Sequence, residues 1–404
     1  MTAVDVLYIS YDGALDPLGR SQVIPYLEGL AATGHRFDLL TFEKPARWAD
    51  PVVRAGTARR LSGSGIRWHP LRYHKRLSPV ATTYDLARGY AKARQLARRR
   101  RFDLIHARSY PSALVAWRLS RATGTPFVFD MRGLYAAERV DGNLWRADGA
   151  LYRGTTALET RFLRDAAAVV TLTRASLPTI QRMVAEAGGT APVAVIPTCV
   201  DLDLFRPAPP TEPFVLGYAG SIGTWYLLDE MLRFGAAVLQ HVDGRVCFLV
   251  NMAPDEVRAA AHAAGVPPGR VDVRSVPHDE VPSQLGIASA TCAFIRATSA
   301  GVARAPTKLS ESLALGIPAA VNRGIGDAAD IVEREGVGVV VDPHDAASFP
   351  SAARRLVDVA NDPSMRARCR SVASRIFDLE AGVRLYGELY ETVAASHALP
   401  SRRP

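Results

Sequence analysis

The chain has 404 residues, of which 48% are hydrophobic and 22% are charged. This length allows two domains of ordinary size, and the composition is that of a globular protein. No apolar run approaches the roughly 20 residues that span a bilayer, and the chain starts without the basic segment and cleavage site of a secretory signal. The four cysteines lie too far apart for a disulfide scaffold or a zinc cluster, which predicts a reducing, cytoplasmic setting.

The net charge of +9 is distributed unevenly along the chain. Residues 1–210 carry 30 basic and 18 acidic side chains, whereas residues 211–404 carry 19 and 22. Only the first half therefore needs an anionic partner to explain its charge. Just four of the 49 basic residues are lysines. Because most basic positions of this chain are arginines, the lysine at position 308 favours a specific role for that side chain.

In the first half, short apolar runs alternate with helical stretches. The pattern predicts strands at residues 4–9, 36–42, 103–106, 126–130 and 168–172, and helices at 21–33, 84–101, 111–123 and 149–163. Apolar strands that alternate with helices indicate a parallel sheet covered on both faces. Residues 197–213 contain five prolines and no hydrophobic period, which predicts a linker between domains.

The alternation restarts after this linker. It predicts strands at 214–218, 246–251, 271–273, 291–295, 318–322 and 338–341, and helices at 226–240, 254–264 and 373–395. The predicted fold class is therefore α/β, with two doubly wound Rossmann-like domains at residues 1–196 and 214–374. Residues 375–404 form a C-terminal helix and tail, expected to cross back to the first domain. Such domains bind ligands in a cleft at the carboxyl ends of their strands.

Residues 305–318 are the most specific segment of the chain. Pro306 precedes a predicted helix, and Lys308 and Glu311 lie on one face of its first turn. A helix start with a lysine is suited to a diphosphate, because free amides and the helix dipole attract anions. Glu311 can then accept two hydrogen bonds from a ribose diol. The alternative is a capped helix with a solvated Lys–Glu pair, and the segment alone does not decide between them.

Several motifs in order give a family resemblance. Residues 197–207 resemble the interdomain junction of family 4 retaining glycosyltransferases of the GT-B fold, and residues 306–318 followed by 324–327 are similar to their donor-binding region. Residues 16–22, 129–133 and 138–142 resemble a bacterial subgroup of the same family. The resemblance covers nearly the whole chain. It implies transfer of a sugar from a nucleotide diphosphate donor of the UDP or GDP type to an acceptor hydroxyl, with retention of configuration and no cofactor.

The resemblance also implies roles for individual residues. Glu311 would bind the ribose, and Lys308 and Thr307 would face the diphosphate. Gly19 and Arg20 would close over the phosphates from the first domain, and glycine at position 220 would let the backbone approach the donor closely. The full set of expected donor-binding residues is Gly19, Arg20, Gly220, Ser221, Thr224, Arg304, Thr307, Lys308 and Glu311.

Two positions depart from the family pattern. Ala303 stands where the family usually has a second glutamate that contacts the donor sugar. Ser221 and Trp225 follow Gly220, where the family usually has an arginine and a lysine. The phosphate charge must then be met elsewhere, and the candidates are Lys308, Arg304 and Arg20.

In the first domain, polar residues follow two predicted strands. We expect His106, Asp130 and Arg132 to act in catalysis together with Lys308, and Arg108, Glu138 and Arg139 to bind the acceptor. Plain loop or core roles are the alternative, especially for the histidine. Asp201 and Asp203 lie in the linker, away from the donor helix, so no metal site is predicted, and cations can neutralise the leaving diphosphate instead.

The run Arg98–Arg101 ends a predicted helix with further basic residues. Basic side chains suit a helix C-terminus, and the alternative is contact with an anionic acceptor or with lipid at the inner membrane face.

Two other functions compete with glycosyl transfer. A sugar-nucleotide epimerase of the same fold would need no acceptor, and a nucleic-acid-binding protein is supported only by the basic first half.

Overall fold

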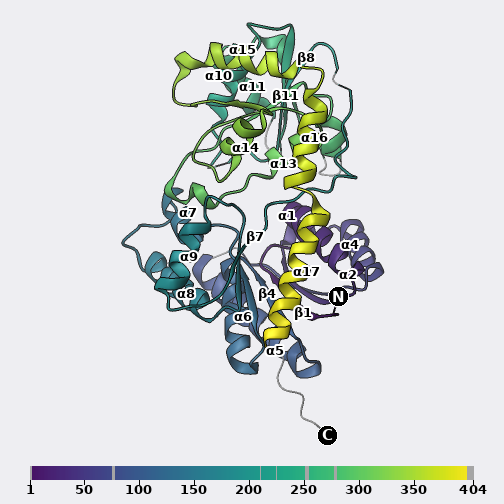
Figure 1. Cartoon of the computed structure of the whole chain (residues 1–404), viewed down its shortest axis with the longest axis vertical. Coiled ribbons are helices and arrows are strands. Elements are labelled where there is room, and N and C mark those ends of the chain that lie inside the picture. The colour runs from purple at the N-terminus through teal and green to yellow at the C-terminus, as the bar shows by residue number, and fades with distance from the viewer. Residues whose placement is uncertain are drawn as a thin grey trace. The chain divides into compact units, whose positions relative to one another are not determined.

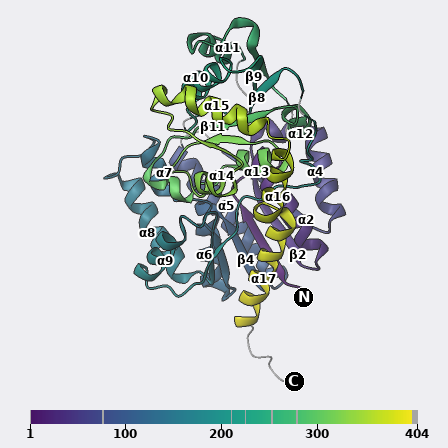
Figure 2. The ribbon, with the colours of Figure 1, turned by 45° about the horizontal axis from the view of Figure 1, so that its top comes forward.

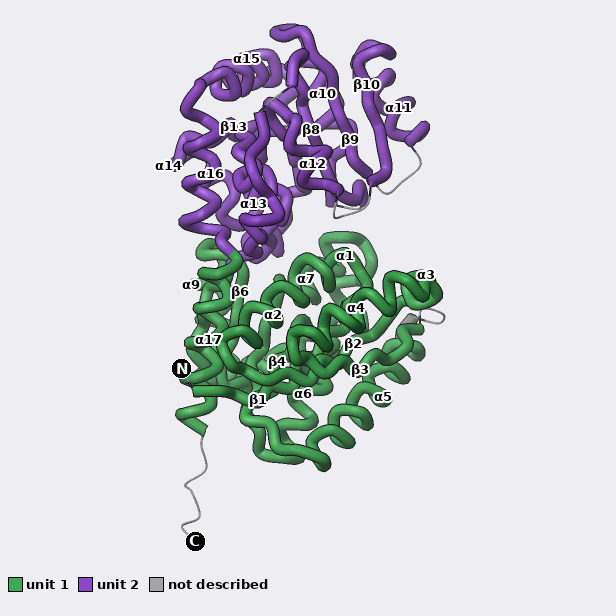
Figure 3. The backbone as a smooth tube through the Cα atoms, turned by 90° about the vertical axis from the view of Figure 1, so that its right-hand side faces the viewer, with its two compact units in different colours: residues 1–196, 379–404 green, residues 197–378 purple. Residues whose placement is uncertain are grey.

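The computed structural model describes residues 2–74, 78–209, 211–223, 225–250, 254–276 and 280–397. The chain divides into two compact units, drawn in separate colours in Figure 3. Unit 1 comprises residues 1–196 and 379–404, and unit 2 comprises residues 197–378. Each unit has a parallel sheet with helices, so the predicted α/β class with two doubly wound units is confirmed.

Within the described residues, unit 1 has a seven-stranded parallel sheet in the order β3-β2-β1-β4-β5-β6-β7. Figure 1 labels β1, β4 and β7 of this sheet. Its apolar strands are buried because helices lie against both faces. The strands are β1 (Asp5–Ser10), β2 (Arg36–Glu43), β3 (Arg67–Arg72), β4 (Leu104–Arg108), β5 (Phe127–Asp130), β6 (Ala168–Thr171) and β7 (Val193–Val195).

The helices of unit 1 include one from the end of the chain. They are α1 (Pro17–Gln22), α2 (Ile24–Ala32), α3 (Pro45–Trp48), α4 (Pro51–Gly63), α5 (Ser78–Arg99), α6 (Ser109–Thr123), α7 (Tyr135–Asp141), α8 (Ala150–Asp165), α9 (Leu177–Glu186) and α17 (Leu379–Ser396). Helix α17 packs against α2 and β4, which confirms that the last helix returns to the first unit.

Unit 2 has, in its described part, a six-stranded parallel sheet in the order β10-β9-β8-β11-β12-β13. Helices α10 and α15 lie side by side against this sheet (Figure 2). The strands are β8 (Phe214–Ala219), β9 (Gly244–Leu249), β10 (Val271–Arg274), β11 (Ala290–Ala293), β12 (Ala319–Val321) and β13 (Gly338–Val340).

The helices of unit 2 follow its strands in alternation. The α-helices are α10 (Leu228–Val238), α11 (Pro254–Ala263), α12 (Val281–Leu285), α13 (Thr307–Ala314), α14 (Ala328–Glu335), α15 (Phe349–Ala360) and α16 (Met365–Ile376). The 3₁₀ helices are η1 (Pro268–Arg270), η3 (Ser299–Ala303) and η4 (Ala346–Ser348). None of the helices in the described ranges of either unit combines the length and hydropathy of a membrane span.

The strand order reverses once in each sheet, between β1 and β4 in unit 1 and between β8 and β11 in unit 2. At such a point the connections on either side lead away from each other, which leaves space for a ligand beyond the carboxyl ends of the strands. We call the end of each sheet at which its strands terminate the carboxyl edge. The opposite end is the amino edge.

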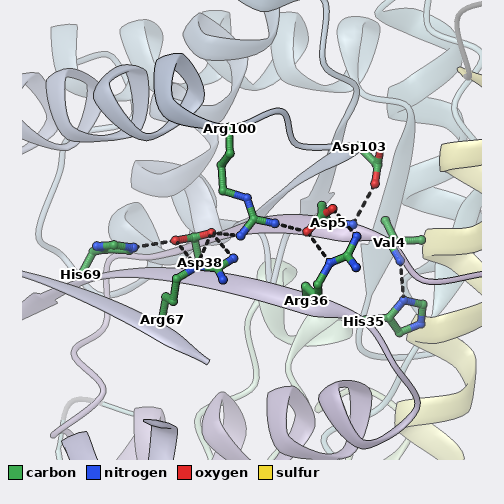
Figure 4. Close-up of polar contacts among 9 residues, drawn as sticks. All are labelled: Val4, Asp5, His35, Arg36, Asp38, Arg67, His69, Arg100 and Asp103. Carbon is green, nitrogen blue, oxygen red and sulfur yellow. Dashed lines mark hydrogen bonds and ion pairs between the residues drawn. The ribbon is translucent and has the colours of Figure 1, made fainter. Parts of the chain in front are cut away.

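The amino edge of unit 1 is closed by a network of ion pairs, drawn in Figure 4. The buried carboxylate of Asp38 accepts hydrogen bonds from Arg67 and Arg100, and its Oδ1 lies 2.7 Å from His69 Nε2. Arg100 also donates to Asp5. This arginine belongs to the basic run at 98–101, so one of its four guanidinium groups has a structural role in the sheet.

Two predicted helices are broken in the structure. The predicted helix at 373–395 is two helices, because α16 ends at Ile376 and α17 begins at Leu379. The carbonyl of Phe377 between them accepts a hydrogen bond of 2.8 Å from the amide of Val200. The predicted helix at 21–33 is also divided, at Val23, before a proline in the first turn of α2 that has no amide hydrogen to continue the helix.

The proline-rich segment at 197–213 is counted with unit 2. Arg370 on α16 donates to the carbonyl oxygens of Leu202 and Phe205, which holds this segment against the helix. Asp201 accepts from the amides of Asp203 and Leu204, and Asp203 pairs with Arg206. The two aspartates therefore stabilise a turn.

Candidate active site

A cavity lies at the carboxyl edge of unit 2, where the strand order reverses. The ends of β8, β11 and β12 bound it on one side and the first turns of α13 on the other. Its polar lining residues include Lys308, Glu311 and Asn322. The sequence motif at 305–318 and the loop after β8 are thus brought to one place.

Helix α13 starts beside this cavity without a cap. Pro306 precedes the helix, and no side chain accepts a hydrogen bond from its first amides. The first-turn amides of a helix have no partner within the helix, and the dipole adds partial positive charge there. An uncapped helix start is therefore suited to bind phosphate oxygens.

Lys308 extends from the first turn of α13 across the loop after β8. Its Nζ lies 4.5 Å from the ring centroid of Tyr226. Gly220 makes room for it, because a Cβ atom at this position would lie 2.5 Å from the Nζ and Cε of Lys308. Gly220 also has φ +139°, a conformation that side chains other than glycine rarely adopt. The glycine is required both by its own backbone and by the lysine.

Glu311 lines the same cavity and is partly buried. Burial raises the pKa of its carboxyl to about 7, although the charge of Lys308 acts in the opposite direction. Among the residues the structure describes, no ion pair or side-chain hydrogen bond engages either Lys308 or Glu311. The solvated Lys–Glu salt bridge considered above is therefore not formed, and both side chains retain hydrogen-bonding capacity toward a ligand.

Two cationic side chains lie near the segment after β8, which lacks the arginine and lysine of the family pattern. The guanidinium of Arg304, which follows η3, lies 4.2 Å from the ring centroid of Trp225. Arg304 and Lys308 therefore place positive charge against the segment after β8, which itself carries Ser221 and Trp225 in place of cations. Ala303 is fully buried. Thr224 lies outside the described residues.

Three further residues, which were not predicted from the sequence, shape this site. The hydroxyl of Tyr218 donates 2.9 Å to the carbonyl of Ser221 and fixes the loop after β8. Tyr226 supplies the ring beneath Lys308. The amide of Asn322 accepts from Ile295 N and donates to Ile295 O, both at 2.8 Å, and so ties the ends of β11 and β12 together. The position of Asn322 directly after a strand was the one available signal.

In unit 1, His106 and Asp130 lie on the neighbouring strands β4 and β5. Their side chains are each 1% exposed, with Nε2 of the histidine 3.5 Å from Oδ2 of the aspartate. Helix α17 covers both: Tyr386 donates 3.2 Å to Asp130, and the hydroxyl of Tyr390 lies 2.8 Å from His106 Nδ1. Burial lowers the pKa of His106. Burial alone would raise the pKa of Asp130, but Arg132 and His106 hold it below its usual range.

The residues that follow β4 and β5 have strained backbones. Ser109 has φ +69° and Arg132 has φ +60°, in the left-handed region. Such strain persists only where surrounding contacts enforce it, and it is concentrated at functional sites. Arg132 lies 3.8 Å from Asp130, and the nearly buried side chain of Arg108 pairs with Asp12.

The loop after β1 folds around a buried carboxylate. Glu43 accepts hydrogen bonds from the amides of Ala14 and Leu15, at 2.8 and 3.1 Å. Gly19 packs against this loop so closely that a Cβ atom would lie 2.0 Å from the carbonyl of Gly13. Arg20 follows in α1 and is partly buried.

Helix α7 carries the predicted acceptor residues Glu138 and Arg139. The Arg139 guanidinium lies 4.6 Å from the ring centroid of Tyr135. Both residues line a cleft of about 780 Å³ within unit 1. Arg108 is not among its lining residues, although Asp12, its partner, is. The roles of all these residues remain predictions. In the described part of the chain, no three His, Cys, Asp or Glu side chains are grouped so as to hold a metal ion.

Solved structures show which fold the chain shares. Sucrose-phosphate synthase from Thermosynechococcus elongatus is 17% identical, with 97% of this chain and 100% of that chain covered and a TM-score of 0.72. A glycosyltransferase from Rickettsia africae is 13% identical, with coverages of 97% and 99% and a TM-score of 0.69. The Anabaena protein Alr3699/HepE in complex with UDP-glucose is 16% identical, with coverages of 97% and 100% and a TM-score of 0.67.

The sequence itself matches one family model. Residues 22–199 match the glycosyl transferase 4-like domain. No curated protein matches the chain. The matched residues contain β2 to β7 of unit 1, and the structural likeness extends over both units. Residues 22–199 therefore match a glycosyl transferase 4-like domain, and the chain shares the GT-B fold.

Proposed function

We propose that the chain transfers a sugar from a nucleotide diphosphate donor of the UDP or GDP type to an acceptor hydroxyl, with retention of configuration and without a metal or cofactor. The observation that supports this proposal most is that Lys308 and Glu311 both line one cavity at the uncapped start of α13. The similar Anabaena structures are complexes with UDP-glucose and with UDP, which agrees with a nucleotide donor.

Unit 2 would bind the donor. Glu311 accepts hydrogen bonds from the two ribose hydroxyls, as a carboxylate can. The amides at the start of α13, with Thr307 and Lys308, receive the diphosphate. Gly220 and Ser221 allow the backbone to approach the phosphates, and Arg304 supplies further positive charge.

The chemistry consists of one bond exchange at the anomeric carbon. The bond from this carbon to the diphosphate oxygen breaks, a bond to the acceptor oxygen forms on the same face, and the acceptor proton passes to the leaving diphosphate. Negative charge grows on the diphosphate as the sugar departs, so Lys308 and the helix start stabilise the transition state more than the bound donor. No base from the protein is then needed.

Unit 1 would bind the acceptor, and Arg132 follows β5 at its carboxyl edge with 12% of its side chain exposed. His106 and Asp130 are almost wholly buried, and this favours a role in holding Arg132 in its strained conformation over direct contact with a substrate. We therefore propose His106 and Asp130 as positioning residues. Arg108, Glu138 and Arg139 stay predictions for acceptor binding.

Thermal unfolding with UDP, GDP and their sugar derivatives tests this function, because a ligand that binds the native state raises the melting temperature. The sugar nucleotide that stabilises the chain is then incubated with candidate acceptors, in buffer and in EDTA. We expect nucleotide release that requires an acceptor and survives EDTA. Conversion of the donor without an acceptor would instead indicate an epimerase, and loss of activity in EDTA would contradict the metal-independent site.

We also propose that the basic end of α5 contacts anionic lipid. Arg98, Arg99 and Arg101 are exposed, whereas Arg100 is held by Asp5 and Asp38. Each exposed arginine adds about 1 kcal/mol of attraction near an anionic surface, so replacing all three by glutamine should weaken binding to phosphatidylglycerol vesicles about 100-fold. Equal sedimentation of both forms with these vesicles would contradict the contact.

A further inference from the structure

The loop after β1 turns three successive amides onto carboxylates of its own unit. Ala14 N donates to Oε1 of Glu43 at 2.8 Å, and Leu15 N donates to Oε2 at 3.1 Å. The preceding amide, of Gly13, donates to Oδ2 of Asp16 at 3.4 Å. Successive amides that point to one place form a concavity that binds anions. In this loop the chain itself supplies the anions.

The Glu43 carboxylate fits this loop closely. The residue is 1% exposed, and a Cβ atom at Gly13 would lie 2.5 Å from its Oε2. Glycine at position 13 therefore leaves the room that the carboxylate occupies. Burial raises the pKa of Glu43, whereas hydrogen bonds with Thr41 and with the two loop amides act in the opposite direction. These hydrogen bonds stabilise a charge that burial alone would disfavour.

The loop lies at the position where doubly wound units receive the phosphates of a nucleotide. It follows β1, beside the reversal of strand order. The next strand in the chain, β2, pairs with β1 and ends in Glu43. In unit 2 the corresponding loop follows β8, and the next strand, β9, ends in Phe248 and Leu249. The strand end beside the loop is therefore acidic in unit 1 and apolar in unit 2.

The same loop forms a wall of the cleft in unit 1. Tyr11 and Asp12 line the cleft from the loop, and Leu18 lines it from α1. The loop and α1 are in close contact, because a Cβ atom at Gly19 would lie 2.0 Å from the carbonyl oxygen of Gly13. A carboxylate that fixes the middle of the loop therefore also fixes the flanking residues that face the cleft.

We propose that Glu43 acts as a built-in anion for the loop after β1, which it holds in shape and whose amides it closes to the phosphates of a nucleotide. Glu43 is thus a positioning residue for the cleft wall. It is also a specificity residue, because it leaves the nucleotide to unit 2. The second role rests on the proposed function, whereas the first concerns unit 1 alone.

Hydrogen exchange of the full chain tests the positioning role, with acetate as the probe. Glu43→Ala removes a group of the size of acetate and leaves the Ala14 and Leu15 amides without their acceptor, so their exchange should quicken at least about tenfold. Acetate should restore their protection in a saturable way, because both of its oxygens accept hydrogen bonds. Acetamide has the same size but one accepting oxygen, so it should not. Equal restoration by acetamide would show that Glu43 only fills space and would overturn this role.

Glu43→Gln keeps the volume of the side chain and serves where Glu43→Ala does not fold. Its carboxamide has one accepting oxygen, so one of the two amides should lose protection at least about tenfold while the other keeps it. Asp38→Asn is the matched control, because Asp38 is a buried carboxylate at the opposite end of β2. This control should lower the melting temperature and leave exchange of the Ala14 and Leu15 amides unchanged. Wild-type exchange in Glu43→Gln, or the same loss of protection in Asp38→Asn, would overturn the positioning role.

Inorganic phosphate and UDP test the specificity role by the same exchange measurement. Phosphate should slow exchange of the Ala14 and Leu15 amides in Glu43→Ala and leave it unchanged in wild type. UDP that protects these amides in wild type, or phosphate that leaves them unprotected in Glu43→Ala, would overturn this role. Failure of both UDP and GDP to bind the chain anywhere would count against the proposed function, and the acetate result would still decide the positioning role.

Discussion

The carboxyl edges of the two sheets use charged residues in opposite ways. In unit 2, Lys308 and Glu311 line a cavity and have no ion-pair partner in the described part of the chain. In unit 1, Arg108 pairs with Asp12, and Asp130 accepts a hydrogen bond from Tyr386. The unit 1 cleft is lined by four tyrosines as well as by charged residues, whereas the charged residues that line the unit 2 cavity are Lys308 and Glu311.

The two edges are therefore suited to different ligands. Buried charges that are paired inside a protein stabilise a defined local structure, and they are poorly available to a ligand. Charges left beside a cavity attract a ligand of opposite charge or one rich in hydrogen bonds. We therefore propose that unit 2 receives the charged nucleotide and unit 1 the acceptor, and the following variants test this proposal.

The largest effect is expected for Lys308→Ala. The lysine interacts most strongly with the diphosphate when the sugar departs, so its loss should lower kcat by about 10²- to 10³-fold, as for removal of one transition-state donor. Steady-state kinetics with a saturating donor measures this. Lys92→Ala, on α5 in unit 1, is the control, and equal kcat in the two variants would show that Lys308 does not act in the reaction.

Glu311→Ala should weaken donor binding more than it lowers kcat. Hydrogen bonds to a charged group contribute roughly 1.5–3 kcal/mol, which corresponds to about 10- to 150-fold in the Kd for the nucleotide. Calorimetric titration of the nucleotide measures the change. Glu256→Ala on α11 removes an exposed carboxylate from the same unit and should bind like wild type. If both variants bind alike, Glu311 does not hold the ribose.

Gly220→Ala should disturb Lys308 indirectly. The added Cβ would lie 2.5 Å from the lysine side chain, at a residue with φ +139°. Strain of this kind costs about 1–3 kcal/mol, so the melting temperature and the donor affinity should both fall. Gly223→Ala meets nothing within 4 Å and has no such conformation, so it is the matched control for the melting temperature. A normal melting temperature for Gly220→Ala would contradict the packing of Lys308 described here.

The pKa of about 7 for Glu311 predicts a pH dependence. The folded chain keeps a proton that the unfolded chain releases near the ordinary carboxyl pKa, so the stability from this group is present below that value and is lost as pH rises through 7. The ribose needs the charged carboxylate, so nucleotide affinity should rise about tenfold between pH 6 and pH 8. Glu311→Gln should remove this dependence, and a retained tenfold rise in that variant would assign it to another group.

Tyr390→Phe should have the smallest effect. It removes one buried hydrogen bond, to His106, which costs about 0.5–1.5 kcal/mol in the free energy of unfolding. Nucleotide affinity should stay at the wild-type value because the bond lies within unit 1. Urea denaturation measures the free energy of unfolding, and calorimetry measures the nucleotide affinity. A change in nucleotide affinity without a change in the free energy of unfolding would contradict the proposal that unit 2 alone binds the nucleotide.

Most of the fold could be predicted because its strands are apolar runs with helices between them. The elements at residues 45–72 were not predicted, because their hydrophobic pattern is weaker. Residues 45–72 hold α3, α4 and β3, and β3 contains a proline, has an arginine at each end and is only half-buried. The break between α16 and α17 depends on a hydrogen bond to Val200, a residue far away in the sequence.

The sequence groups the candidate site residues of unit 2 more directly than those of unit 1, because the unit 2 residues are close together in the chain. Lys308 and Glu311 are three residues apart, so the sequence places both on one helix turn. The partners of His106 and Asp130 are Tyr390 and Tyr386, and more than 250 residues separate each pair. Arg100 likewise pairs with Asp5 at a separation of 95 residues, so the sequence showed only a basic run.

Hydrogen exchange with and without UDP and GDP tests most directly the claim that the start of α13 receives the diphosphate. The account predicts that a bound nucleotide slows exchange of the Thr307 and Lys308 amides and of the loop at 220–223. Exchange at the start of α15, another helix of unit 2 without a side-chain cap, should be unchanged. Binding of a nucleotide that leaves the Thr307 and Lys308 amides unprotected would contradict the account.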